Sequence, residues 1–223
     1  MIAALLLVIT AFLAGSDWFA VYTEREYLNR LTKPAVLAVL MVWFVASGGT
    51  RGELLWFLAG LVFSLLGDVL LLMPERQFVR GLAAFLVAHV CYAIGFNHPL
   101  PALNAHFFLL FGIVAALGWM MAVLIRSGLV ARGRLDMFPY VALYSAAIGA
   151  MFFSSALTLF RPEWQPAHAR LAAAGGMLFF FSDFMLAYNR FCRAFPRARF
   201  WVRVTYHLGQ FGLTAAALSH FIK

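Results

Sequence analysis

The chain has 223 residues, of which 64% are hydrophobic and 12% are charged, and its formal net charge is +8. Soluble globular proteins carry roughly a quarter charged residues, so this composition excludes an ordinary soluble domain. It is typical of an integral membrane protein, and we expect an all-α fold because helices satisfy their own backbone hydrogen bonds in lipid.

Eight apolar segments follow one another along the chain, and each is compared with the roughly 20 residues that a transmembrane helix needs. They cover residues 2–20, 34–47, 54–73, 80–97, 103–125, 138–159, 169–188 and 201–221. The second is the shortest, and we expect Lys33 and Pro34 to open it. The links between segments are short, so residues 1–223 are expected to form a single transmembrane helical domain, a polytopic bundle with about eight spans.

Positive charge is concentrated in alternate loops. Thirteen of the 17 Lys and Arg residues lie in segments 21–33, 74–80, 126–137 and 189–203, which fall on one side of the membrane when eight spans alternate. By the positive-inside rule this side is cytoplasmic and both termini face outward. The net charge then reflects membrane topology and gives no reason to expect nucleic acid as a partner. We expect a multi-pass protein of a bacterial inner membrane with periplasmic termini.

Two aspartates interrupt the apolar segments. Asp68 follows Gly67 in the third segment, and Asp183 follows Ser182 in the seventh. A carboxylate at membrane depth is costly, so each is by default a candidate functional residue. At about 1.5 Å per residue, both are expected roughly 8 to 9 Å from the cytoplasmic ends of their helices, at one depth. The alternative is a structural role, in which each carboxylate accepts hydrogen bonds from a neighbouring helix.

Other polar residues fall on the same side of the predicted bundle. The further candidate site residues are Lys33, Tyr144, Tyr206, His207, Gln210, His89 and Asp17. Tyr206, His207 and Gln210 occupy adjacent turns and predict one polar face, whereas His89 lies deeper, where packing is the simpler role. Zinc or iron would accept a set made of the two aspartates with His89 and His207. No His-x-x-x-His or Glu-x-x-His spacing supports such a site, and no metal is expected.

A weak internal duplication is also visible. The third and fourth segments share an order of features with the seventh and eighth: a small residue before Asp, an apolar run, a basic loop, and a motif with Tyr and His. This order predicts a parallel 4+4 repeat with its axis along the membrane normal. A chance match of short motifs in apolar sequence explains it equally well.

Several motifs together resemble one known family. They are Thr32-Lys-Pro34, Ser64-Leu-Leu-Gly-Asp-Val-Leu-Leu71, Gly81-Leu-Ala-Ala-Phe-Leu-Val-Ala-His-Val-Cys-Tyr92, Phe181-Ser-Asp-Phe-Met-Leu-Ala187, and Tyr206 with Gln210. In this order they resemble the lysoplasmalogenase (YhhN-like) family of membrane proteins. The resemblance implies a helical bundle of about eight spans, a lysophospholipid substrate taken from the bilayer, and hydrolysis of its vinyl ether bond to a fatty aldehyde and a glycerophospho-head compound. It also implies that Asp68 and Asp183 are the catalytic pair.

Two carboxyl groups suit this chemistry and no cofactor is needed. A protonated carboxyl, which burial favours, delivers a proton to the β carbon of the vinyl ether, and an ionised one stabilises the resulting cation or orients water. Lys33 is expected to hold one carboxylate ionised or to contact the substrate phosphate. Tyr206, His207 and Gln210 are expected to orient water or bind the glycerol. The role of each aspartate stays open at this point.

Two other functions are compatible with the sequence. A small proton- or cation-coupled transporter would use the same aspartates as ion-binding groups, with alternating access across the repeat. The outer halves of the predicted spans are almost entirely apolar, which favours a pocket open to one side. A lipid-sensing or scaffold protein that keeps the fold without activity is the third reading. The lipid headgroup and the oligomeric state are not indicated by the sequence.

Overall fold

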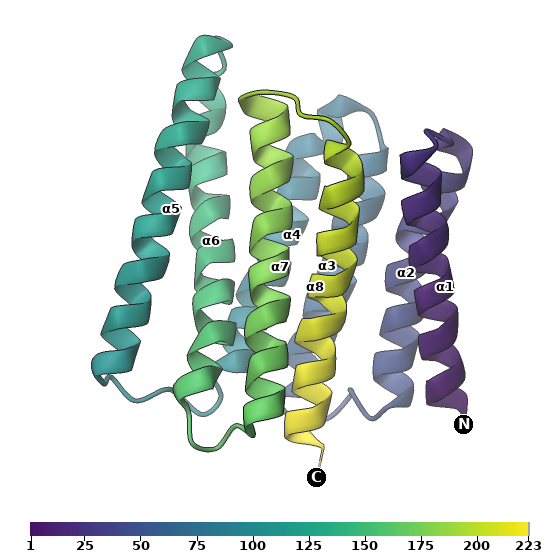
Figure 1. The fold of residues 1–223 in the computed structure, drawn as a ribbon, viewed down its shortest axis with the longest axis vertical. Helices are drawn as coiled ribbons and strands as arrows, with labels where there is room; N and C mark the ends of the chain where they lie inside the picture. Colours follow the sequence, from purple (N-terminus) through teal and green to yellow (C-terminus); the bar gives the residue numbers. More distant parts are fainter. Residues whose placement is uncertain (223) are drawn as a thin grey trace.

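The computed structural model describes residues 1–222 as a bundle of long antiparallel helices (Figure 1). Within this part of the chain there are eight α-helices and no β-strand. The helices are α1 (Ile2–Tyr22), α2 (Glu26–Ala46), α3 (Leu54–Leu72), α4 (Phe78–Phe96), α5 (Ala105–Ala131), α6 (Phe138–Leu157), α7 (Pro166–Phe191) and α8 (Ala198–Phe221). Short 3-10 helices precede α4, precede α6 and follow α6; they are η1 (Glu75–Gln77), η2 (Leu135–Met137) and η3 (Thr158–Phe160). The predicted all-α bundle is confirmed.

Seven of the helices described in residues 1–222 are long and apolar enough to cross a membrane. The eighth, α8, has 24 residues and runs beside α7 along the bundle (Figure 1), but its composition is more polar. Thirteen of its residues are buried, among them Arg203, His207 and Gln210. A helix enclosed by protein meets little lipid, so it tolerates polar residues whose partners lie on neighbouring helices.

The second helix begins earlier than its apolar segment in the sequence predicts. It starts at Glu26, and Pro34 lies inside it instead of opening it. Proline has no backbone N–H and removes one hydrogen bond to the preceding turn, but neighbouring helices allow proline within membrane helices. The polar turn with Asn29 and Lys33 is therefore helical, and both side chains are buried. The prediction placed this turn in a loop.

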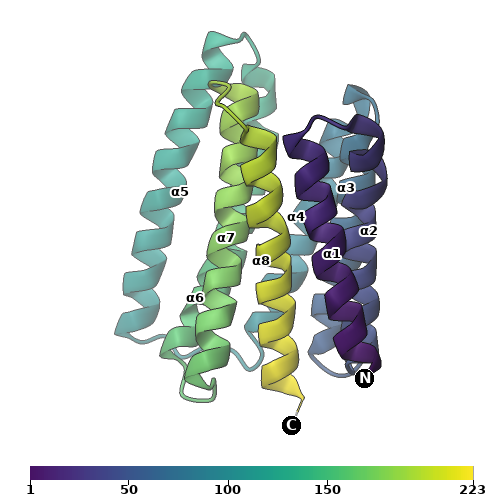
Figure 2. The ribbon, with the colours of Figure 1, turned by 45° about the vertical axis from the view of Figure 1, so that its right-hand side comes forward.

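Several helices that follow each other in sequence pack as antiparallel pairs. The most extensive contacts join α7 with α8, α3 with α4, and α1 with α2. In Figures 1 and 2, α1 and α5 lie toward opposite sides of the bundle, with α7 and α8 between them. These two outer helices also have the smallest buried share among the candidate spans, so most of their surface is available to lipid.

Glycines allow α7 and α8 to approach each other closely. A Cβ atom at Gly175 would lie 2.6 Å from the backbone nitrogen of Leu213, and one at Gly212 would lie 2.8 Å from the Cα atom of Gly175. Small residues at such contacts let helix backbones pack where apolar surface alone gives little driving force in lipid. The contact fixes α7, which carries Asp183, against α8, which carries Tyr206.

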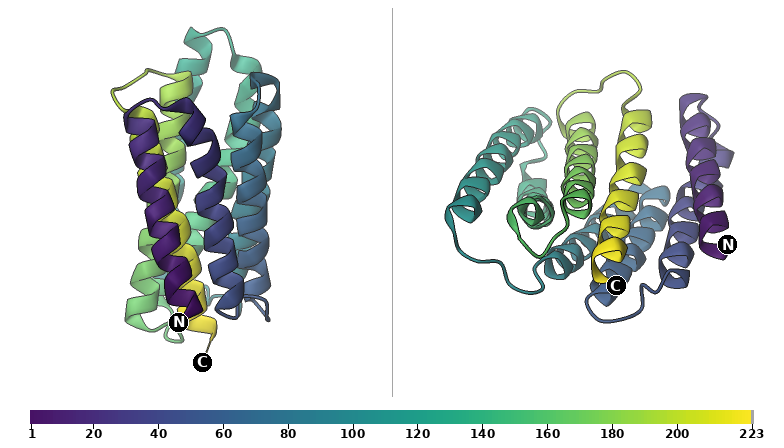
Figure 3. Two further views of the ribbon diagram at one scale, coloured as in Figure 1. Left: turned by 90° about the vertical axis from the view of Figure 1, so that its right-hand side faces the viewer. Right: turned by 60° about the horizontal axis from the view of Figure 1, so that its bottom comes forward.

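The N-terminus and the end of α8 lie at the same end of the bundle (Figure 3). The opposite end, uppermost in Figure 1, is called the basic end here because it holds the arginine-rich loops. Asp68 lies four residues before the last residue of α3, and Asp183 lies eight residues before the last residue of α7. Since α7 continues past residue 188, the two acids are not equally far from their helix ends. The internal duplication stays a prediction.

Candidate active site

A cavity of about 370 Å³ extends from the basic end into the bundle. Every helix except α1 contributes residues to its lining. Asp68 and Asp183, predicted as a pair, both line this one cavity. The predicted residues Lys33, Tyr144 and Tyr206 line it as well. The sequence therefore identified five side chains that the fold brings together from five different helices.

Asp68 has a partner on each carboxylate oxygen. The Lys33 Nζ atom lies 3.1 Å from Oδ1, and the Tyr206 hydroxyl donates to Oδ2 at 2.8 Å. Asp68 is only 1% exposed. A buried carboxylate needs a paired cation and hydrogen bonds to offset its lost hydration, and these contacts supply both. Of the two roles predicted for Lys33, the ion pair with an aspartate is the one seen.

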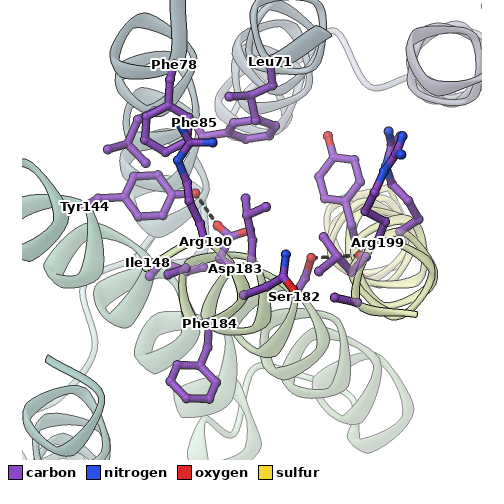
Figure 4. A pocket seen from close by; sticks show the side chains of 18 of the residues that line it. Leu71, Phe78, Phe85, Tyr144, Ile148, Ser182, Asp183, Phe184, Arg190 and Arg199 are labelled. Atoms are coloured by element: carbon purple, nitrogen blue, oxygen red, sulfur yellow. Dashed lines mark hydrogen bonds between the residues drawn. The ribbon is translucent and has the colours of Figure 1, made fainter. Parts of the chain in front are cut away.

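Asp183 has a different environment, in which its contacts converge on a single oxygen. The Tyr144 hydroxyl donates to Oδ2 (Figure 4), and the His89 Nε2 atom lies 3.2 Å from the same oxygen and 3.0 Å from the Tyr144 hydroxyl. Among residues 1–222, Oδ1 has no hydrogen-bond partner, and the Asp183 side chain is 10% exposed. This second oxygen is free to contact a molecule in the cavity.

His89 and Gln210 lie behind the cavity wall and hold the residues that line it. His89 contacts Asp183 and Tyr144 as described. The Gln210 Nε2 group donates to the Tyr206 hydroxyl at 3.4 Å, and Gln210 Oε1 accepts from the Tyr92 hydroxyl at 2.6 Å. Neither His89 nor Gln210 lines the cavity. We predicted that His89 and Gln210 contact the substrate. In the structure they instead contact Asp183, Tyr144 and Tyr206, the side chains that line the cavity.

His207 does not belong to the same polar face as Tyr206 and Gln210. Its Nδ1 atom accepts a hydrogen bond from Trp18 Nε1 at 3.1 Å, and its ring stacks on the Trp18 indole. Successive residues of a helix point about 100° apart, so a residue next to Tyr206 faces α1 when Tyr206 faces the cavity. The single polar face predicted for these three residues is wrong for His207.

Asp17 forms a buried network with α2 and α8 instead of lining the cavity. Thr32 donates to Asp17 Oδ1 at 2.8 Å, and Arg203 Nη1 lies 3.3 Å from Asp17 Oδ2. The Nη2 group of Arg203 also donates to Asn29 Oδ1 at 3.0 Å. Asn29 and Arg203 do line the cavity, and neither was predicted as a site residue. Helical spacing could have indicated both residues. Asn29 lies four residues before Lys33, and Arg203 lies three residues before Tyr206, so each shares a helix face with a predicted site residue.

The cavity has a charged end and an apolar wall. Four arginines line it in addition to Lys33; they are Arg30, Arg190, Arg199 and Arg203. The apolar wall is built by side chains of α5, α6 and α7, among them Met121, Ile125, Val141, Ile148, Phe180 and Phe184. In Figure 4, Arg199 lies on α8 and Arg190 on α7, with Asp183 and Tyr144 facing each other. Such a cavity fits a molecule with a charged group and an apolar chain.

The candidate zinc or iron set is not assembled in the described structure. No three His, Cys, Asp or Glu side chains within residues 1–222 are grouped in a way that could hold a metal ion. Asp183 and His89 are in contact, but Asp68 pairs with Lys33 and His207 faces Trp18.

The chain is similar in sequence to several known membrane proteins and lysoplasmalogenases. Lysoplasmalogenase TMEM86B of Rattus norvegicus is 32% identical over 200 residues, covering 87% of this chain and 75% of the relative. Lysoplasmalogenase TMEM86A of Homo sapiens is 34% identical over 164 residues, covering 71% of this chain and 63% of the relative. The membrane protein YhhN of Escherichia coli is 28% identical over 203 residues, covering 88% of this chain and 91% of the relative.

No solved structure matches the chain. The family model described as the YhhN family matches residues 28–217, which include Asp68 and Asp183 together with Lys33, Tyr144 and Tyr206. The chain is therefore an integral multi-pass membrane protein that belongs to the YhhN family.

Proposed function

We propose that this protein is a membrane-embedded hydrolase that cleaves the vinyl ether bond of lysoplasmalogens. The products are a fatty aldehyde and a glycerophospho-head compound. The observation that carries the proposal is the single cavity in which Asp68 and Asp183 lie between a charged end and an apolar wall. The names of the relatives from Rattus norvegicus and Homo sapiens support the same substrate class.

The reaction consumes one water and needs no redox partner. Protonation of the β carbon of the vinyl ether gives an oxocarbenium ion at the carbon bonded to oxygen. Water adds to that carbon and loses a proton, and the hemiacetal then collapses to the aldehyde and the alcohol of the glycerol. The protein has to supply one proton donor, stabilise a short-lived cation and accept the proton of water.

Asp183 is the proton donor in this proposal. Its Oδ1 atom is free to face a substrate, while Oδ2 accepts a hydrogen bond from the Tyr144 hydroxyl and lies 3.2 Å from His89 Nε2. These contacts suit a carboxylic acid whose proton sits on the free oxygen and whose carbonyl oxygen accepts. After transfer, the same two contacts stabilise the carboxylate until it recovers a proton from water.

Asp68 is the group that stays ionised. Its ion pair with Lys33 and its hydrogen bond from Tyr206 hold a negative charge on the cavity wall. A carboxylate held in place by these two contacts stabilises the positive charge that develops on the substrate. It is also placed to orient the attacking water. The different partners of the two acids support this division of labour.

The basic end is assigned to the cytoplasmic face of a bacterial inner membrane, with both termini outside. The support is the positive-inside rule applied to the arginine-rich loops. A single-chain lipid of the inner leaflet would place its headgroup at the charged end of the cavity and its alkenyl chain along Met121, Ile125 and Ile148.

Release of fatty aldehyde from lysoplasmalogen by purified protein tests the proposal, with the Asp183→Asn and Asp68→Asn variants beside the wild type. Loss of a general acid typically costs about 100-fold or more, and we expect a loss of this size for Asp183→Asn. Asp136→Asn is the matched control, because Asp136 is an exposed acid near the basic end that does not line the cavity. It should keep wild-type activity.

A saturated 1-O-alkyl lysophospholipid provides the substrate control, since it has no double bond to protonate and should not be cleaved. Full activity in both aspartate variants would end the proposed mechanism. Uptake of a cation into proteoliposomes that depends on the same aspartates, without aldehyde release from lysoplasmalogen, would instead support the transporter.

A further inference from the structure

The charged end of the cavity has more cations than the two aspartates require. Lys33 is committed to Asp68 at 3.1 Å. Arg199 pairs with Glu26 at 2.6 Å, and Arg190 pairs with Glu75 at 2.7 Å and lies over the Phe78 ring. These three cations are thus neutralised by partners within the protein.

Arg30 differs from these cations in having no acidic partner within residues 1–222, and Arg203 differs from the other arginines of the cavity in being buried. Arg30 is exposed, lines the cavity and has no acidic partner within 4 Å among the described residues. Arg203 is buried, with 9% exposure, and its contacts to Asp17 and Asn29 use two of the five N–H donors of a guanidinium. Its remaining donors are available to a ligand in the cavity. Arg30 and Arg203 come from α2 and α8, which contact each other.

Arg30 and Arg203 each lie one helical turn from a residue that contacts Asp68. The Asp68 carboxylate is held by Lys33 of α2 and Tyr206 of α8. Arg30 lies three residues before Lys33, and Arg203 lies three residues before Tyr206, so each arginine shares a helix face with the residue that holds Asp68. Both helices start at the basic end, so each arginine lies about 4.5 Å nearer to that end, at 1.5 Å per residue.

We propose that Arg30 and Arg203 form the subsite for the phosphate of a lysophospholipid headgroup, and that Asp17 and Asn29 are positioning residues that hold the Arg203 guanidinium. The inference rests on the proposed function, because it names the part of the substrate that this end of the same cavity binds. In a lysoplasmalogen the vinyl ether oxygen and the phosphate are attached to opposite ends of the three-carbon glycerol. If the phosphate lies about one helical turn nearer the basic end than Asp68, the glycerol extends inward from it and the vinyl ether lies beside the two aspartates.

The chemistry of the two side chains suits a phosphate. Guanidinium groups present a planar fork of donors that matches phosphate oxygens, and charge-assisted hydrogen bonds are roughly twice as strong as neutral ones. Arg203 is fixed before binding by Asp17 and Asn29, so little conformational freedom is lost when it contacts the ligand. Arg30, being exposed at the mouth, is free to close over the phosphate from the other helix.

The test is a binding measurement with ligands that the protein cannot cleave. A saturated 1-O-alkyl lysophospholipid and the matching 1-O-alkylglycerol, which lacks the phosphate, are titrated into the protein in zwitterionic nanodiscs. We expect the wild type to bind the phosphate-bearing ligand about tenfold more tightly or better, a ratio typical of charge-assisted contacts. Arg30→Gln and Arg203→Gln should each reduce this ratio severalfold without changing the affinity for the alkylglycerol.

Two further variants separate a binding role from a structural one. Asp17→Asn keeps the charge of Arg203 but loosens its position, so it should reduce the ratio by a smaller factor. Arg76→Gln is the matched control, because Arg76 is an exposed arginine at the same end of the bundle that does not line the cavity. It should leave the ratio unchanged. Arg30→Gln alters an exposed side chain, so its result does not depend on whether the buried Arg203 variant folds.

Three results would overturn the subsite. Equal losses of affinity for both ligands in the Arg30 and Arg203 variants would show a general effect on the cavity, and an unchanged ratio would show that the phosphate binds elsewhere. Displacement of the lipid by inorganic phosphate at similar concentration would show a site for a free anion instead of a lipid headgroup. Because neither ligand is cleaved, this experiment decides the subsite whether or not the protein releases aldehyde.

Discussion

The ion pair between Lys33 and Asp68 gives a prediction that separates stability from activity. In Lys33→Met the side chain keeps a similar length but loses its charge. Asp68, 1% exposed, then retains only the hydrogen bond from Tyr206 at 2.8 Å. We expect lower stability because a buried carboxylate without its cation has lost its main compensation for dehydration.

The loss of stability in Lys33→Met depends on the ion pair that is removed. Removing one partner of a buried ion pair costs about 3 to 5 kcal/mol, and the surviving Tyr206 hydrogen bond favours the lower end of that range. For a chain of about this length, 1 kcal/mol corresponds to roughly 2 to 4 °C in melting temperature. A loss of about 3 kcal/mol therefore predicts a melting temperature roughly 6 to 12 °C below that of the wild type.

A double-mutant cycle in detergent measures this coupling. Lys33→Met, Asp68→Asn and the double variant are melted beside the wild type, with Arg76→Met as a control for loss of an exposed cation. We expect the double variant to be more stable than Lys33→Met by at least about 1 kcal/mol, because no buried charge is left unpaired. It should remain inactive, since Asp68 is absent. Additive effects of the two single changes would refute the reasoning.

Gly175→Ala should destabilise the protein by about 1 to 3 kcal/mol, because the new methyl group would clash with the Leu213 backbone nitrogen. Gly112→Ala is the control, because its Cβ has no atom within 4 Å, and its melting temperature should equal that of the wild type. Gly118 lines the apolar wall and also has open space at its Cβ position, so Gly118→Leu should slow cleavage of long-chain substrates more than short-chain ones. An unchanged chain-length profile would show that the alkenyl chain does not pass α5. Tyr144→Phe removes a donor to Asp183 and should lower kcat about tenfold or more, whereas His207→Phe should change kcat by no more than about twofold. The opposite order of these two kcat values would contradict the site as described.

The central part of the site was predictable because the cost of a charge in lipid is large. Asp68 and Asp183 stood out in apolar segments for that reason, and the alternation of basic loops placed them on the same side of the bundle. Lys33, Tyr144 and Tyr206 were predicted as site residues only because they lie at a similar depth in the membrane. All five line the same cavity. For these residues, position along the membrane normal was enough to indicate a shared site.

Rotation about each helix axis was harder to predict than depth. It separates Tyr206, which faces the cavity, from His207, which faces Trp18. It also decides that Asp17 pairs with Arg203 instead of joining the other acids. Such choices depend on which helices become neighbours, and a single sequence with nearly uniform apolar surface gives weak information about that.

The start of α2 was missed for a local reason. Pro34 and the preceding polar residues are typical of a helix start, and the prediction placed residues 26–33 in a loop. In the folded protein, Asn29 and Lys33 have partners on α3 and α8, so this polar turn is stable as a buried helix. Tertiary partners outweighed the local signal, and they brought Asn29 and Arg203 into the cavity wall.

Proton transfer from Asp183 to the β carbon is the step on which the proposed vinyl ether cleavage depends. The most direct measurement is hydrolysis of lysoplasmalogen in D2O, with the aldehyde reduced at once to the alcohol and analysed by mass spectrometry. We expect one deuterium on the carbon next to the former aldehyde carbon, and we expect Asp183→Asn to lower the rate of aldehyde release about 100-fold or more. Product released by the enzyme without deuterium at that carbon would contradict this proton transfer.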